Sequence, residues 1–158
     1  MCIYKFTLWV DPWATSEEAQ LSYVDIDNLL NKQSGLKGIC GINDMREIHN
    51  QAENGKPPAQ LAIEMYCYRI KKYIGAYSAV LNHVDAIVFT AGIGENAAFI
   101  REKVCEGLNG LGIILDTAKN QLQRSDILDI SAAESPVKIL TIPADEEWEI
   151  AQLTMSLL

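Results

Sequence analysis

The sequence predicts an α/β fold in which short strands alternate with helices. Apolar runs rich in β-branched residues alternate with helical hydrophobic patterns through the second half of the chain. The chain has 158 residues, of which 49% are hydrophobic and 22% charged, so it can build the core of one domain. No uncharged apolar run reaches the roughly 18 residues that a membrane-spanning helix needs, so none is expected.

The first half of the chain is predicted to be mainly helical. Residues 1–13 are rich in aromatic side chains, and we expect an edge strand there. Ser22 and Asp25 have the spacing of a capping box, which predicts the start of a helix. Segment 35–47 contains three glycines and is predicted to be a loop. Apolar residues recur at helical spacing from 57 to 81, on more than one side, which predicts a long helix that is central or at an interface.

The second half is predicted to alternate between strands and helices. The apolar run at 85–90 has the composition of a fully buried strand. A glycine-rich turn at 91–96 follows it and leads into a helix. The remaining elements are expected in this order: strands at 112–116, 126–130 and 137–142, and a terminal helix from 145.

The charge and the cysteines limit the partners and the compartment. The formal net charge is −8, and so acidic a surface repels nucleic acid and anionic membranes, which we do not expect as partners. Cys2, Cys40, Cys67 and Cys105 are widely spaced and form no C-x-x-C pair. This usage is typical of free thiols in a reducing compartment, so we expect a cytoplasmic protein without disulfides or a zinc site.

The glycine-rich turn is the strongest candidate for a binding site. Gly92 and Gly94 allow a ligand to approach the backbone closely. The pattern Gly92-x-Gly94-x-x-Ala97, with Asp116 further along, is compatible with a dinucleotide-binding motif. A nucleoside pocket is the alternative, and a structural turn in which Asn96 caps the next helix is a third interpretation.

Glu95 bears on the choice between these ligands. A carboxylate inside the turn would repel a pyrophosphate, whereas it can accept hydrogen bonds from a neutral ribose or adenine.

Two further clusters are candidates. Asp44 and Arg46 are expected to point the same way, and a guanidinium can stack on a base or hold a phosphate; the alternative is a surface ion pair of little consequence. Three acids at 145–147 stand at a predicted helix start. They either favour the helix dipole alone or include a carboxylate that helps to hold Mg²⁺.

Four segments together resemble one family, the acetate kinases and their propionate kinase relatives. These segments are 27–38, 43–46, 85–96 and 142–147, and they follow the order and approximate spacing of that family. The resemblance covers residues 10–158 and corresponds to the C-terminal part of the family, which we expect to be a nucleotide-binding domain. Residues 1–9 do not match.

The resemblance implies a fold and a reaction. It implies α/β architecture as a single C-terminal domain of the actin-like ATPase (ribonuclease H-like) superfold. Members transfer the γ-phosphoryl group of Mg-ATP to acetate, and they form homodimers. By motif match, Asp44, Met45 and Arg46 would lie at the nucleotide, Gly92, Ile93, Gly94, Glu95 and Asn96 would line the adenosine pocket, and Glu146 would be the carboxylate associated with Mg²⁺.

The family's N-terminal phosphate-binding signature, acetate pocket and catalytic residues have no match in this sequence. We therefore expect ATP or ADP to bind at most weakly, and we expect little or no acetate kinase activity from this chain alone, because phosphoryl transfer depends on such contacts. The alternatives are a dimerisation remnant without ligand binding and a dinucleotide-binding domain.

Overall fold

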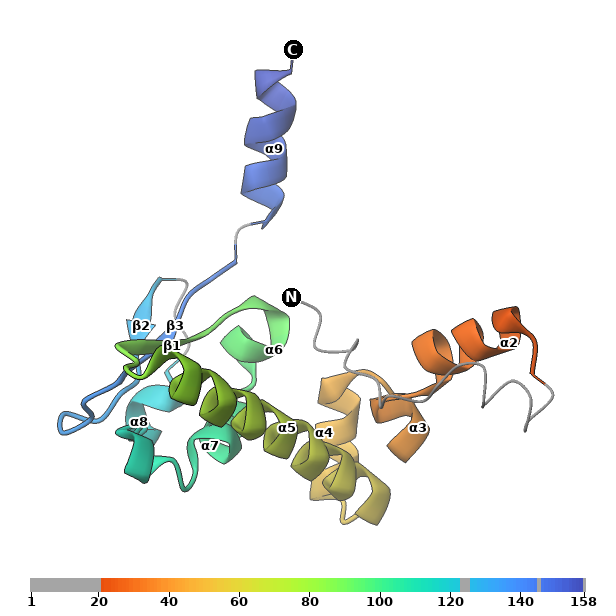
Figure 1. The fold of residues 1–158 in the computed structure, drawn as a ribbon, viewed down its shortest axis with the longest axis horizontal. Coiled ribbons are helices and arrows are strands. Elements are labelled where there is room, and N and C mark those ends of the chain that lie inside the picture. The colour runs from red at the N-terminus through yellow and green to blue at the C-terminus, as the bar shows by residue number, and fades with distance from the viewer. Residues whose placement is uncertain (1–20, 123–125, 145, 158) are drawn as a thin grey trace. The chain divides into compact units, whose positions relative to one another are not determined.

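The computed structural model describes residues 21–122, 126–144 and 146–157. The chain divides into two compact units, Met1–Tyr66 and Cys67–Leu158, and the boundary between them falls inside the long helix α5 (Pro57–Leu81). Figure 1 shows the elements of both units along the chain. The expected strand at 1–13 lies outside the described residues.

The first unit is helical in its described residues. Ser22 caps α2 (Tyr23–Asn28): its hydroxyl accepts a hydrogen bond from the Asp25 amide at 3.2 Å, and its own amide donates to the Asp25 carboxylate at 3.1 Å. This confirms the predicted capping box. The chain continues through a π-helical turn, η2 (Leu29–Gln33).

The prediction of a loop at 35–47 was wrong. The segment contains helix α3 (Leu36–Cys40), and helix α4 (Met45–Glu53) begins within it. Gly35 is the N-cap of α3 with φ of 66°, and Gly41 is its C-cap with φ of 79°. These glycines therefore mark the two ends of a helix and do not form an extended loop. Among the described residues of this unit, the buried apolar side chains are Ile26, Leu36, Met45, Ile48, Ala59, Ala62 and Ile63.

Helix α5 confirms the prediction for 57–81. It has 25 residues and starts at two prolines, which the first turn of a helix tolerates. Ala62, Ile63 and Cys67 are buried, whereas Tyr68 and Val80 remain exposed. The helix is therefore apolar on more than one side, as the sequence predicted.

The second unit contains a mixed three-stranded sheet in the order β1-β3-β2. β1 (Ala86–Phe89) runs parallel to β3 (Lys138–Thr141), with Phe89 opposite Thr141. β2 (Leu128–Asp129) pairs antiparallel with β3. The strands expected at 85–90, 126–130 and 137–142 are thus present. Short helices follow β1 and precede β2: α6 (Ala91–Asn96), α7 (Ala98–Cys105), η3 (Asn109–Leu111) and α8 (Thr117–Asn120).

Two expectations for this unit were wrong. β1 is not fully buried, because only Phe89 is buried and Val88 is 48% exposed. Segment 112–116 forms no strand but a single bridge between Leu115 and Ser131. Gly112, at φ 75°, turns the chain before this segment, and Asp116 caps α8 after it, so no room remains for a regular strand.

The core of the second unit lies between the sheet and helix α7. Ile100, Val104, Ile113, Ile130 and Ile139 are each almost inaccessible to solvent. Cys67 and Cys105 are buried free thiols, and desolvation raises the pKa of each to about 11.

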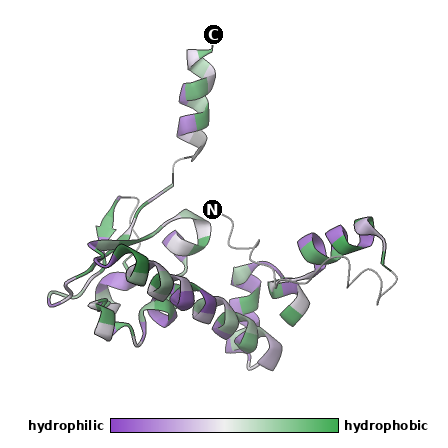
Figure 2. Ribbon diagram, viewed as in Figure 1, coloured by the Kyte–Doolittle hydropathy of each residue, from purple (hydrophilic) through white to green (hydrophobic). Residues whose placement is uncertain are grey.

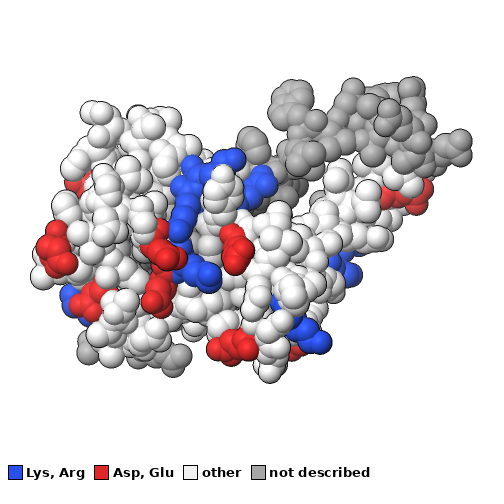
Figure 3. All heavy atoms as spheres, turned by 90° about the horizontal axis from the view of Figure 1, so that it is seen from below, with Lys and Arg blue, Asp and Glu red and all other residues white. Residues whose placement is uncertain are grey.

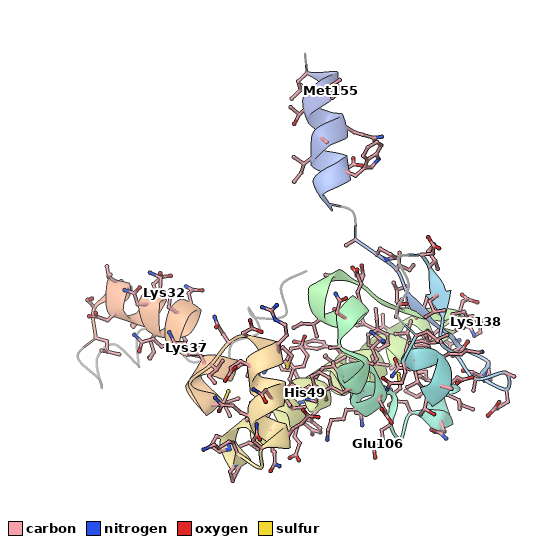
Figure 4. The ribbon with its side chains drawn as sticks, turned by 180° about the vertical axis from the view of Figure 1, so that it is seen from behind. Lys32, Lys37, His49, Glu106, Lys138 and Met155 are labelled. Atoms are coloured by element: carbon pink, nitrogen blue, oxygen red, sulfur yellow. The ribbon has the colours of Figure 1, made fainter. Side chains whose placement is uncertain are left out.

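The predicted terminal helix is α9 (Glu146–Ser156), on which Figure 4 labels Met155. Its apolar side chains stay in solvent: Trp148, Ile150, Leu153 and Met155 are all more than half exposed. Figure 2 shows hydrophobic and hydrophilic residues side by side along it. Among the described residues, no helix is both long and apolar enough to cross a bilayer.

Candidate functional site

The glycine-rich segment forms the junction between β1 and α6. Thr90 is extended, and Ala91 turns the chain with φ of 60°, a left-handed conformation that is strained for a residue with a side chain. Residues 91–96 then form one short helix in place of the predicted turn. Backbone strain of this kind is often found where a chain is held in shape for binding.

The two glycines of the motif have different surroundings. A Cβ atom on Gly94 would lie 3.1 Å from the carbonyl carbon of Phe89, which is backbone and cannot move aside easily. A Cβ atom on Gly92 would meet nothing within 4 Å. Packing of α6 against the end of β1 therefore explains Gly94, whereas nothing in the described fold explains Gly92.

Asn96 does not cap the following helix, which corrects the third interpretation of the turn. Its side-chain amide donates to the carbonyl oxygen of Gly92 at 2.9 Å, within α6. The residue before α7 is Ala97, and no side-chain cap is formed there. Ile93 is half-buried within the same short helix.

Glu95 connects α6 to the segment before α9. Its carboxylate Oε1 accepts a hydrogen bond from the amide of Ala144 at 2.8 Å, across 49 residues of sequence. Ala144 lies two positions before Glu146, the first residue of α9. The second unit thus brings the glycine-rich segment close to the start of the acidic block, although the side chain of Glu146 lies outside the described atoms.

Asp116 has a structural role in the described fold. Its carboxylate accepts a hydrogen bond from the Lys119 amide at 3.0 Å and lies 3.7 Å from the Lys119 ammonium group. It thereby caps α8, and these contacts lower its pKa. The carboxylate suggested for a ribose is thus already used at a helix start.

Asp44, Met45 and Arg46 belong to the first unit and start helix α4. The Asp44 carboxylate caps the helix by accepting the Arg46 amide at 2.9 Å, and it also binds the guanidinium through Nε at 3.1 Å and Nη2 at 2.7 Å. The two side chains therefore point the same way, as predicted, but on a helix cap and not on extended backbone. Met45 is buried.

Solvent surrounds this ion pair. The Arg46 side chain is 92% exposed and that of Asp44 is 45% exposed. Hydrogen bonding to Arg46 lowers the pKa of Asp44 to about 2, and the same contacts raise the pKa of Arg46. Figure 3 shows basic and acidic side chains interspersed on one face of the molecule.

The sequence analysis missed Arg101 and Asn120, which lie beneath the glycine-rich segment. Arg101, on α7, is 3% exposed, and Asn120, at the end of α8, is fully buried. The guanidinium donates through Nη1 to the carbonyl oxygens of Gly94 at 2.8 Å and Glu95 at 2.7 Å. The signal that reveals Arg101 is its spacing: buried residues occupy 97, 100, 101 and 104, the i, i+3, i+4, i+7 pattern of an inward helix face.

No group of three or more acidic, histidine or cysteine side chains in the described part of the chain is placed to hold a metal ion. Mg²⁺ does not require such a group, because it takes one or two protein carboxylates together with substrate phosphates and water. A single carboxylate at the start of α9 is compatible with that chemistry.

Comparison with known proteins identifies the family. The pattern of the Acetokinase family matches residues 12–152. The chain is 55% identical over 141 residues to an acetate kinase of Lawsonia intracellularis and 56% identical over 142 residues to one of Nitratidesulfovibrio vulgaris (strain DP4). These alignments cover 89% and 90% of this chain but only 35% of either relative.

Solved structures agree. The acetate kinase of Porphyromonas gingivalis superposes with a TM-score of 0.83 at 44% identity, over 93% of this chain and 38% of that one. A propionate kinase from Francisella tularensis gives a TM-score of 0.80 at 42% identity, over 90% and 37%. The chain therefore has part of the actin-like ATPase fold of these kinases, spans about a third of the length of its curated relatives, and belongs to the acetokinase family.

Proposed function

We propose that this chain forms the adenine-nucleotide side of an acetate kinase cleft and binds ATP or ADP through residues 92–96 and 44–46. The observation that supports this most directly is Gly92. A glycine within a helix costs about 1 kcal/mol relative to alanine, and a Cβ atom at this position would meet nothing within 4 Å. A ligand that lies against the backbone is a reason for a glycine where packing gives none.

The test compares the two glycines. Gly92→Val should weaken binding of Mg-ADP by about tenfold or more, the loss expected for a blocked contact surface, with little change in urea unfolding. Gly94→Ala should instead lower the free energy of unfolding by about 1–3 kcal/mol because of overpacking against Phe89. Isothermal titration with Mg-ADP, together with urea unfolding, separates the two effects.

The alternatives predict different titrations. If the wild-type chain gives no heat with millimolar Mg-ATP or Mg-ADP, the dimerisation remnant becomes the better description. Enhanced fluorescence of NADH on addition of the chain would instead support dinucleotide binding. Membership of a kinase family and the use of Asp116 as a helix cap both favour the nucleoside pocket.

Mg²⁺ would be held with the nucleotide, and we propose Glu146 as the protein carboxylate that supports it. When bound, the ion neutralises charge on the phosphates. The hydrogen bond from the Ala144 amide to Glu95 fixes the backbone two residues before Glu146. Glu146→Gln should reduce the gain in ADP affinity that Mg²⁺ produces, and titrations with EDTA in place of Mg²⁺ measure that gain.

We propose that the chain alone has little or no acetate kinase activity. Phosphoryl transfer is accelerated by positioning and by charge stabilisation, and an arginine at the transferred group alone contributes about 10³–10⁵ in rate. The sequence offers no match to the family's phosphate-binding and acyl-binding segments. An acetyl-phosphate assay on the purified chain tests this, and turnover near that of a full-length kinase would contradict it.

We also propose a homodimer that buries the exposed apolar side chains of α5. Tyr68, Tyr77 and Val80 are each at least half exposed, an unusual amount of apolar surface for one helix. Sedimentation should give twice the monomer mass, and Val80→Lys should shift the chain to monomer.

A further inference from the structure

Arg101 is a buried cation held without a carboxylate. It is 3% exposed, and no ion pair among the described residues involves it. Its guanidinium donates to four oxygens: the Asn120 side chain at 2.7 Å, the Asn120 carbonyl at 2.8 Å, and the carbonyls of Gly94 and Glu95. A buried charge is costly unless it is hydrogen-bonded, and here neutral oxygens accept from four of the five N–H donors of the guanidinium.

The contacts with α6 occur at the end of that helix, where backbone carbonyls lack partners. The last carbonyls of any helix have no amide of the same helix to accept from. In α6 the Ile93 carbonyl is satisfied by the Ala97 amide at 2.9 Å. Arg101 Nη1 satisfies the next two, Gly94 and Glu95, at 2.8 and 2.7 Å.

Asn120 fixes the other edge of the guanidinium. Its side-chain oxygen accepts from Arg101 Nε, and its side-chain nitrogen donates to the Ala98 carbonyl at 2.9 Å. Because the amide is used at both ends, it has a single orientation. The planar fork of an arginine can bridge α6 and α8 in this way, whereas the single nitrogen of a lysine cannot reach all four oxygens.

We propose that Arg101 is a positioning residue for the nucleotide segment: its guanidinium fixes the end of α6, so that residues 92–95 keep the backbone path that the ligand meets and the Glu95 carboxylate stays on the Ala144 amide. Arg101 itself does not touch the ligand. This inference rests on the proposed nucleotide binding for its functional part, whereas the hold on α6 is testable without any ligand.

Amide hydrogen exchange on the full 158-residue chain tests the hold on α6. Arg101→Gln should speed exchange of the amides at 93–97 by at least about tenfold, because the hydrogen bonds from Arg101 to the carbonyls of Gly94 and Glu95 are lost. Arg101→Lys should give a smaller increase, since the charge and one or two bonds remain, and it serves if the glutamine variant does not fold. Ile113→Val, which trims the buried core of the same unit, is the control for general loss of stability.

The outcomes separate a positioning role from a purely structural one. Faster exchange confined to α6, with β3 amides as slow as in the Ile113→Val chain, supports the proposal. Exchange in α6 no faster than in that control overturns it.

Mg-ADP affinity then tests the functional part. We expect Arg101→Gln to lower the affinity for Mg-ADP about tenfold and Ile113→Val to leave it unchanged. The affinities for ADP and AMP should fall equally, because the segment contacts the nucleoside. Unchanged affinity despite mobile α6 amides overturns the proposal. If wild-type chain binds no nucleotide, the proposed function fails, and the exchange data alone decide whether Arg101 holds α6.

Discussion

The two candidate nucleotide segments are stabilised in opposite ways. Residues 92–96 lie on a buried network in which Arg101 satisfies the carbonyls at the end of α6 and Asn120 accepts hydrogen bonds from Arg101. Asp44 and Arg46 form an ion pair in solvent, with the arginine side chain 92% exposed. The first segment has a backbone fixed in advance of any ligand. The second keeps its charged group free to reorient, because an exposed pair contributes little to stability.

The largest expected effect comes from breaking the buried network. Asn120→Ala removes the acceptor of Arg101 Nε and the donor to Ala98, and each buried partner left unsatisfied costs about 1–3 kcal/mol. We expect the free energy of unfolding to fall by about 3 kcal/mol, measured by urea denaturation. Asn109→Ala, at an exposed position in η3, is the matched control and should change stability little. Equal effects of the two substitutions on the free energy of unfolding would mean that the buried network does not stabilise the fold.

The exposed pair is expected to affect binding and not folding. Arg46→Ala should leave the urea midpoint nearly unchanged, since the guanidinium lies in solvent. It should weaken Mg-ADP binding by roughly tenfold, the effect of losing one charged contact. Calorimetric titration measures this, and unchanged affinity would rule out Arg46 as a nucleotide contact. Lys56→Ala, also exposed in the first unit, is the control for a general loss of positive charge.

The left-handed backbone of Ala91 allows a test of strain in the glycine-rich segment. Ala91 has φ of 60°, where alanine is disfavoured by about 1–2 kcal/mol and glycine is not. Ala91→Gly should therefore raise the free energy of unfolding by about 0.5–1 kcal/mol after the entropy that glycine adds to the unfolded chain. Ala76→Gly, in the exposed interior of α5, should lower it by about 1 kcal/mol. Thermal unfolding of both variants shows whether each substitution raises or lowers the free energy of unfolding. Destabilisation in both would mean that Ala91 is not strained.

The ion pair between Asp129 and Lys138, in which both side chains are partly exposed, gives the smallest expected effect. Asp129 accepts from the Lys138 ammonium at 2.9 Å and from Ser131, and these bonds lower its pKa to about 2. Its unfolded pKa is about 3.9. The pair therefore stabilises the fold fully above about pH 4, and this contribution is lost as the pH falls towards 2.

Asp129→Asn tests whether the ion pair causes this loss of stability at low pH. The variant should lose less stability than wild type between pH 4 and 2, and the difference should stay below about 1 kcal/mol because Lys138 is in solvent. Lys138→Gln should reduce the same pH dependence. Urea midpoints at a series of pH values give the comparison, and identical acid profiles for all three chains would refute the assignment. Figure 4 labels Lys138 on β3.

Local patterns in the sequence were sufficient for the elements that depend on neighbouring residues. The capping box at Ser22, the helix at 57–81 and the strands β1 and β3 are formed by residues close in sequence or by uniform apolar runs. Segment 35–47 was mispredicted because its glycines mark helix ends and not a loop. The burial of β1 was overestimated because an apolar run does not say whether another layer covers it.

The candidate site was predicted only in part for a similar reason. The glycines and the Asp44–Arg46 pair could be identified from short motifs. The spacing of Arg101 places it on an inward helix face, but its hydrogen-bond partner could not be predicted, because Asn120 is 19 residues away and only tertiary structure brings the two together. Likewise, Glu95 contacts Ala144 across 49 residues, so its role on a backbone amide was not visible in the turn itself.

The reactivity of Cys67 and Cys105 reports how often the second unit opens. Alkylating reagents attack the thiolate. Both sulfurs are buried and burial raises the pKa of both thiols to about 11, so we expect little reaction at neutral pH while the unit is closed. Each modification of these sulfurs therefore records a moment at which the unit has opened. Mass spectrometry of the alkylated chain therefore follows transient opening at these native cysteines without any engineered residue.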